Sequence, residues 1–244
     1  MVKFVIFCTK VILIAITTLL FASCGNNVFD GIKGNGNVQT EKRTLTDKFT
    51  KVEVSRGLEV ILEQGDQVLV EVEADQNLLK HITTKVENGT LLVSSDENIY
   101  SAEKEIVRIK MPIIEGLSTT SGSNIKSKNS LKGTTISVSS TSGSEIQADL
   151  EYDSISTETS SGSNITIAGK ALKLKTNASS GSEINANDLL ANEIISQATS
   201  GSSIEVHPLL NLVAKSSSGA SINYSGTPKV ITKEETSGGS VSSN

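Results

Sequence analysis

The 244-residue chain contains no tryptophan and only three prolines, and aromatic residues make up 3% of it. All five phenylalanines fall within the first 49 residues, and the later aromatics are three tyrosines. Aromatic platforms for stacking bases or sugars are therefore scarce. The net charge of −5 excludes the basic excess that binds phosphates, so no nucleic acid partner is expected. So few prolines also exclude a collagen-like or polyproline chain.

Long hydrophobic runs are absent apart from one near the N-terminus. Two lysines, Lys3 and Lys10, precede an apolar stretch over residues 11–23. As a helix this stretch would span roughly 20 Å, which is short of a ~30 Å hydrocarbon core. It therefore predicts a signal peptide over residues 1–23 instead of a membrane span.

The cysteines suggest how the mature chain begins. Small residues precede Cys24, in the order Ala22-Ser23-Cys24, which resembles a bacterial lipoprotein signal. The sequence therefore predicts lipid attachment at Cys24, followed by a flexible tether over residues 24–37 that is rich in Gly and Asn. A plain secretory peptide with an incidental cysteine is the alternative. The other cysteine, Cys8, would be removed, which leaves the mature chain without a disulfide.

An internal repeat dominates the rest of the chain. The motif Ser-Gly-Ser-x-Ile recurs five times and then decays twice, at intervals between 18 and 21 residues. Its glycines are Gly122, Gly143, Gly162, Gly181, Gly201, Gly219 and Gly238. A fixed period of this length indicates stacked units, none of which can bury its own apolar face alone. A disordered Ser/Gly linker would have no reason to keep isoleucine at one offset.

The apolar positions identify the kind of unit. Isoleucine or valine stands three residues after each glycine, and a large apolar residue stands seven residues before the next one. From that position toward the next glycine, the large residue is followed at every second position by smaller ones in all but the last repeat. β-branched residues dominate the pattern. This pattern predicts an all-β fold: a right-handed parallel β-helix over residues 117–244, with about 19–20 residues per coil. Like residues would stack about 4.8 Å apart, and each glycine would permit a positive φ at a corner.

Residues 38–116 are less regular but also rich in strands. Polar and apolar residues alternate over 51–54, 58–63 and 68–73, and Asn88-Gly89 predicts a hairpin between two further strands. A last strand, 106–111, leads into the first repeat. We expect a strand-rich N-terminal head that covers the first coil, because the open end of a solenoid needs a cover.

Together these motifs resemble a known family. Gly57-Leu58-Glu59-Val60, Gln64-Gly65-Asp66, Asn88-Gly89-Thr90-Leu91, the strand that ends at Pro112 and the Ser-Gly-Ser repeats are similar to the head-GIN-domain family of auto-transporter adhesins. The resemblance covers about residues 36–244. It implies an exported bacterial β-solenoid with an adhesin or surface role, and it carries no catalytic residues over.

Residues that could support chemistry are few. The two histidines, His81 and His207, have no second His or Cys at metal-ligand spacing, so no metal site is expected. The repeated serines lack a Gly-x-Ser-x-Gly elbow, and a periodic residue is more simply a structural corner. The sequence therefore predicts no catalytic residue and no cofactor.

One acidic cluster supports a rival hypothesis. Asp149, Glu151 and Asp153 alternate at period two and could project together from one strand. A carbohydrate-active β-helix would use such carboxylates as an acid–base or nucleophile pair. This hypothesis predicts a deep groove at the cluster and strongly perturbed pKa values for its carboxyl groups.

The leading hypothesis is a non-enzymatic, lipid-anchored protein of the cell envelope, placed in the outer membrane. Its solenoid would present a polar Ser/Thr/Asn face to an envelope polysaccharide or another surface protein, where many weak contacts add up. A third hypothesis is a purely structural envelope protein that associates with itself. The last repeat begins a corner and then stops, which would leave an uncapped strand edge. The sequence does not decide the oligomeric state.

Overall fold

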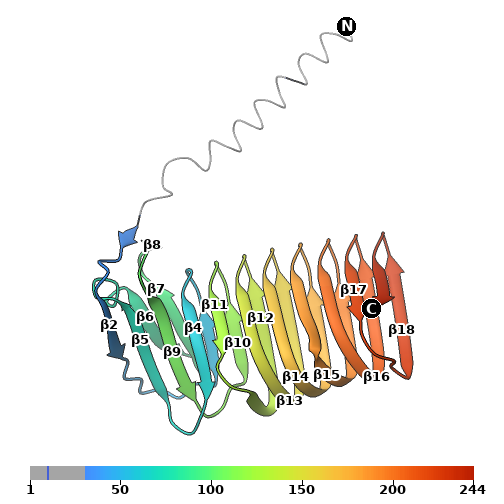
Figure 1. The fold of residues 1–244 in the computed structure, drawn as a ribbon, viewed down its shortest axis with the longest axis horizontal. Helices are drawn as coiled ribbons and strands as arrows, with labels where there is room; N and C mark the ends of the chain where they lie inside the picture. The colour runs from blue at the N-terminus through green and yellow to red at the C-terminus, as the bar shows by residue number, and fades with distance from the viewer. Residues whose placement is uncertain (1–9, 11–30) are drawn as a thin grey trace.

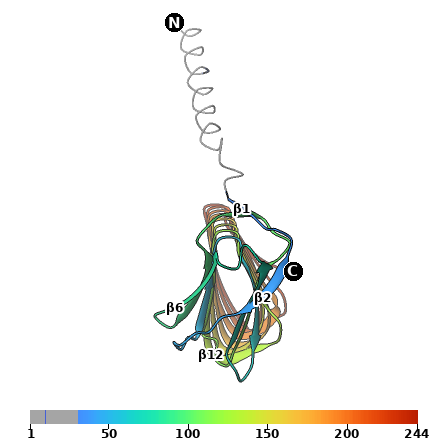
Figure 2. The ribbon, with the colours of Figure 1, turned by 90° about the vertical axis from the view of Figure 1, so that its left-hand side faces the viewer.

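The computed structural model describes Lys10 and residues 31–244. Every regular element in the range 31–244 is a β-strand, and the strands stack side by side along one rod (Figure 1). The predicted parallel β-helix is confirmed. Seen along its axis, the rod has two long faces that meet at narrow edges (Figure 2).

The strands divide into an N-terminal set and the repeat coils. The N-terminal set is β1 (Ile32–Lys33), β2 (Val38–Lys42), β3 (Lys51–Val54), β4 (Glu59–Gln64), β5 (Leu69–Asp75), β6 (Ile82–Glu87), β7 (Thr90–Ser95), β8 (Ile99–Ser101) and β9 (Glu105–Met111). The repeat coils contain β10 (Gly116–Thr119), β11 (Asn124–Ser127), β12 (Leu131–Thr141), β13 (Glu145–Ser160), β14 (Asn164–Ala178), β15 (Glu183–Ala198), β16 (Ser203–Ser217), β17 (Ser221–Tyr224), β18 (Val230–Thr236) and β19 (Ser240–Ser243).

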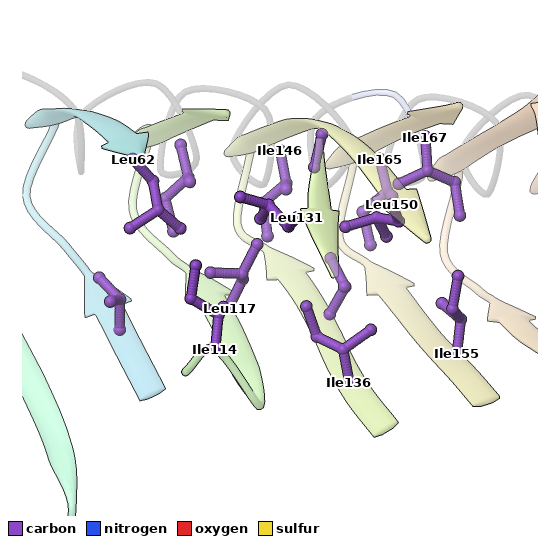
Figure 3. Packing of buried hydrophobic residues seen from close by; sticks show 14 of the residues in the cluster. Leu62, Ile114, Leu117, Leu131, Ile136, Ile146, Leu150, Ile155, Ile165 and Ile167 are labelled. Atoms are coloured by element: carbon purple, nitrogen blue, oxygen red, sulfur yellow. The ribbon is translucent and has the colours of Figure 1, made fainter. Parts of the chain in front are cut away.

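The repeat isoleucines stack as the spacing predicts. After each corner, Ile125 pairs with Ile146, then Ile165, Ile184, Ile204, Ile222 and Val241 in successive coils. The opposite face carries Ile136, Ile155, Leu174, Ile194, Leu212 and Ile231 in the same way. The two rows point toward each other inside the rod, as Ile146 and Ile136 illustrate (Figure 3). All members except Ile231 are buried, so these rows form the core.

Strands from the N-terminal set continue both faces of the solenoid. β3 pairs in parallel with β10 on one side and β7 on the other, while β4 lies in parallel between β11 and β9. The coil formed by β3 and β4 therefore lies between two coils that come later in the chain. Antiparallel strands complete this end, since β6 pairs with β7, β5 with β9, and β2 with β5. The β6–β7 pairing confirms the hairpin predicted at Asn88-Gly89.

Candidate functional site

Each Ser-Gly pair forms a sharp corner in which both residues have a positive φ. The first serines have φ between 50° and 58°, and their glycines have φ between 67° and 78°. In the first six of these corners the glycine N–H donates to the carbonyl of the corner serine in the next coil, at 3.1–3.2 Å. The corners therefore align in one edge of the rod, where they form the row of loops at the top of Figure 1.

The second serine of each motif is structural. Ser123, Ser144, Ser163, Ser182 and Ser202 are at most 2% exposed. The Ser144 hydroxyl, for example, donates to the Thr141 carbonyl at 2.6 Å and accepts the Thr141 N–H at 3.1 Å. These serines point inward and satisfy backbone groups that the corner would otherwise leave unpaired.

The first serine of each motif has a different environment, although the sequence pattern does not separate the two. Its left-handed conformation costs a residue with a Cβ roughly 1–2 kcal/mol, a cost that Gly or Asn avoids. At the hairpin corner of the N-terminal set, Asn88 takes this position with φ 50°. The seven repeat corners carry serine instead: Ser121, Ser142, Ser161, Ser180, Ser200, Ser218 and Ser237.

These seven side chains are exposed and contribute little to the fold. Ser121, Ser142 and Ser200 approach a neighbouring threonine hydroxyl at 3.4–3.5 Å. For the other four, no hydrogen bond from the hydroxyl exists within residues 31–244. Strained backbone under an exposed side chain that adds little or no bonding to the fold makes the corner serines the candidate functional residues.

A second row of hydroxyls runs beside the first. The residue before each corner serine is Ser or Thr throughout: Thr120, Thr141, Ser160, Ser179, Thr199, Ser217 and Thr236. Some of these hydroxyls bond between coils, as Thr141 does with Ser160 at 3.1 Å and Ser217 does with Thr199 at 3.2 Å. We call the two rows together the corner hydroxyl edge. It spans seven coils, or roughly 29 Å at about 4.8 Å per coil.

The broad faces are chemically mixed. One outward row reads Ser139, Glu158, Asn177, Gln197, Lys215 and Glu234. This row therefore mixes a hydroxyl, amides and charges of both signs, whereas the rows at the corner edge carry hydroxyls throughout.

A shallow groove lies at the opposite edge, where the strands bend. Its volume is about 420 Å³, and it is lined by Glu151, Tyr152, Asp153, Lys170, Ala171, Leu172, Leu190, Asn192 and Leu209. Two of the three predicted carboxylates, Glu151 and Asp153, belong to this lining. All three lie on β13 and alternate with the buried Leu150 and Tyr152, so they do project to the same side.

The electrostatics at Glu151 are unlike those of a catalytic acid. Its carboxylate pairs with Lys132 at 3.2 Å and with Lys170 at 3.3 Å. Hydrogen bonds from these two lysines lower the pKa of Glu151 below the ordinary value of 4.5. A general acid for glycoside hydrolysis needs a raised pKa, so this carboxylate is tuned in the opposite direction.

Tyr152, which lines the groove, gives a pH-dependent prediction. Its hydroxyl donates to the Ile114 carbonyl at 2.8 Å, and burial, followed by the charge of Glu115, raises its pKa from 10.0 to about 12. Because the unfolded phenol ionises first, stability that is full below pH 10 should fall as the pH rises toward 12. We expect ultraviolet titration to show a phenolate transition near pH 12 that Tyr152→Phe abolishes. The same transition in the variant would refute the assignment.

The histidines have ordinary polar partners. His81 Nδ1 lies 2.8 Å from Asp96, and His207 Nδ1 lies 3.2 Å from the Asn187 carbonyl oxygen. Within residues 31–244, no group of three or more His, Cys, Asp or Glu side chains is arranged to hold a metal ion.

The part of the chain that the structure describes contains no helix with the length and hydrophobicity of a membrane span. Apart from Lys10, the predicted signal peptide lies outside the described residues, and so does Cys24.

The fold and its aligned corners define a class of protein, the parallel β-solenoids built from short Ser/Gly-cornered coils. Within that class, residues 48–228 match the family model described as "Putative auto-transporter adhesin, head GIN domain". The chain belongs to this family, which confirms the resemblance of its motifs. No curated protein matches the chain.

Solved structures share the same fold. A "putative adhesin" from Bacteroides fragilis aligns with a TM-score of 0.82 at 17% identity, over 88% of this chain and 100% of its own. A "putative lipid binding protein" from Parabacteroides distasonis aligns at 0.70 and 19% identity, over 87% and 99%. A "putative adhesin" from Parabacteroides merdae aligns at 0.66 and 20% identity, over 88% and 99%. At these identities the similarity establishes the fold alone.

Proposed function

We propose that this protein is a non-enzymatic adhesin of the bacterial cell envelope that binds a polysaccharide along its corner hydroxyl edge. The family and the shared fold support an adhesin of the envelope. The observation that carries the binding site is the row of seven exposed serines, each held in a strained left-handed conformation.

The chemistry of the edge favours a hydroxyl-rich polymer as its partner. A hydroxyl group both donates and accepts hydrogen bonds, so aligned rows can pair with the hydroxyls of successive sugar units. Each contact to solvent-exposed hydroxyls is weak, but a partner with its own repeat can engage several coils at once. A lone sugar would gain little from this arrangement.

Lipid attachment at Cys24 is part of the same proposal. It is supported by the apolar stretch and the small residues before this cysteine. The continuous described part of the chain begins at Gly31, seven residues after Cys24, and each extended residue covers at most about 3.6 Å. A lipid at Cys24 would therefore hold the N-terminal end of the rod within roughly 25 Å of a membrane, which we place in the outer membrane.

A pair of asparagine substitutions tests the binding edge. Ser161→Asn with Ser180→Asn replaces two corner hydroxyls by a residue that favours the same backbone conformation. We expect equal or higher thermal stability, because Asn tolerates a positive φ. We also expect at least tenfold weaker binding to whole cells and to immobilised peptidoglycan, mucin and dextran, because the longer amide side chains interrupt the regular row of hydroxyls in two adjacent coils. Surface plasmon resonance and cell pull-down measure the binding.

The matched control carries the same chemical change on a broad face. Ser137→Asn with Ser156→Asn alters two outward serines of one row away from the corners. This variant should bind like the natural chain. Equal binding by the corner variant, or an absence of binding by the natural chain to every surface tested, would refute the proposal.

A further inference from the structure

The last coil of the solenoid departs from the repeat at two core positions. In the preceding coils the inward positions before the corner carry small residues, such as Ala214 and Ser216. In β18 the residues in register with these two are Lys233 and Glu235. Charged side chains therefore stand where the repeat calls for small, buried ones.

These two side chains reach across the open mouth of the coil to β19. The Lys233 ammonium donates to the Val241 carbonyl at 3.0 Å, and a Glu235 carboxylate oxygen accepts the Val241 N–H at 2.5 Å. The ammonium also lies 4.9 Å from the centre of the Tyr224 ring, which belongs to the coil beneath. Lys233 and Glu235 thus cover the interior of the rod with charge-assisted contacts.

The backbone of Val241 explains why these contacts matter. Ser240 and Asn244 donate their N–H groups to Ala220 and Tyr224 in the preceding coil. Since alternate residues of a strand bond to opposite sides, Val241 turns its own N–H and carbonyl away from that coil. In the described part of the chain β19 pairs with β17 alone, so Val241 would otherwise offer a free edge.

We propose that Lys233 and Glu235 form a polar plug that closes this end of the rod to a second copy of the chain. The same end exposes Val230 and Ile231, at 56% and 39%, and Ile231 continues a core row. An apolar end with free backbone groups is a template for strand pairing between molecules, and inward-pointing charges are a known protection. The plug therefore argues against the hypothesis, drawn from the sequence, that this protein associates with itself.

A double substitution tests the plug by restoring the repeat. Lys233→Ala with Glu235→Ser gives the last coil the residues that the preceding coil carries at 214 and 216. We expect the variant to associate end to end, with a sedimentation mass that rises about twofold with concentration, while the natural chain stays monomeric. The control, Lys215→Ala with Glu234→Ser, removes an exposed ion pair of 2.7 Å from the same coils and should stay monomeric.

Two results would overturn the plug. One is a folded double variant that remains monomeric at every concentration, and the other is a natural chain that itself associates through this end. If the double variant fails to fold, hydrogen exchange of the Val241 amide in the natural chain tests the plug instead. The Val241 amide should then be protected, and exchange should accelerate at least tenfold in Glu235→Ala. An unprotected Val241 amide in the natural chain would also refute the plug.

Discussion

Ile194→Ala is expected to destabilise the protein by about 3–4 kcal/mol, because the alanine leaves a cavity inside the rod. The side chain is 1% exposed and lies between Leu174 and Leu212 in a continuous core row. Coils stabilise one another only through their neighbours, so a cavity here weakens two interfaces at once. For a chain of this size the loss corresponds to a melting temperature lower by roughly 10 °C.

The adjacent residue provides a matched control. Ile195 follows Ile194 directly on β15 but points outward and is 54% exposed. Ile195→Ala removes the same atoms and should change the free energy of unfolding by less than about 0.5 kcal/mol. Thermal unfolding followed by circular dichroism compares the two variants. Similar losses from both would contradict the assignment of the two faces.

Gly169→Ala should cost about 2–5 kcal/mol for a different reason. Gly169 has φ 116°, and a Cβ at this position would lie 2.2 Å from the Leu150 carbonyl oxygen. The substitution therefore adds backbone strain of roughly 1–2 kcal/mol and a clash that displaces the neighbouring coil, at about 1–3 kcal/mol. Because the obstacle is backbone, no side-chain rotation relieves it.

A corner glycine separates the strain from the clash. Gly162 also has a positive φ, 69°, but no atom lies within 4 Å of the position of its Cβ. Gly162→Ala should therefore cost about 1 kcal/mol. Urea unfolding measures both variants. Equal losses would show that conformation alone, and not the approach of Leu150, makes Gly169 necessary.

The period of the repeat was sufficient to predict the coils. Isoleucine three residues after each glycine, and a tapering row before the next, specify which side chains stack, and the structure confirms both rows. A strand with side-chain period two allows few alternatives once one face must be buried. The hairpin at Asn88-Gly89 was predictable for a similar local reason, since this pair favours a turn with two positive φ values.

The N-terminal coil was harder to find. Arg56 and Gly57 form a corner with φ 63° and 78°, and the Gly57 N–H donates to the Ser121 carbonyl at 3.0 Å. Val60 then stands three residues after Gly57 and stacks on Ile125, as in the repeats. The offset is visible in the sequence, but the partner coil begins about sixty residues later. The spacing of residues within one coil does not show that this coil pairs with a coil so much later in the chain.

The candidate site was only partly predictable. The sequence pattern indicated polar corners, but it treated the two serines of each motif alike. Burial and φ distinguish the two serines, because Ser144 is 2% exposed with three hydrogen bonds to its hydroxyl, whereas Ser142 is exposed with φ 58°. The alternation of Asp149, Glu151 and Asp153 correctly placed them on one side of a strand. The lowered pKa of Glu151 depends on Lys132 and Lys170, which lie in the neighbouring coils.

The order of the coils has a consequence for how this protein can change in evolution. From β12 to β16 each coil pairs with the coil immediately before and after it in the chain. A duplicated or deleted segment that runs from one corner to the next would therefore leave both ends of the rod intact. Each such event would alter the reach of the protein by about 4.8 Å. The interleaved coil of β3 and β4 does not permit the same exchange, so growth in length is restricted to the C-terminal half.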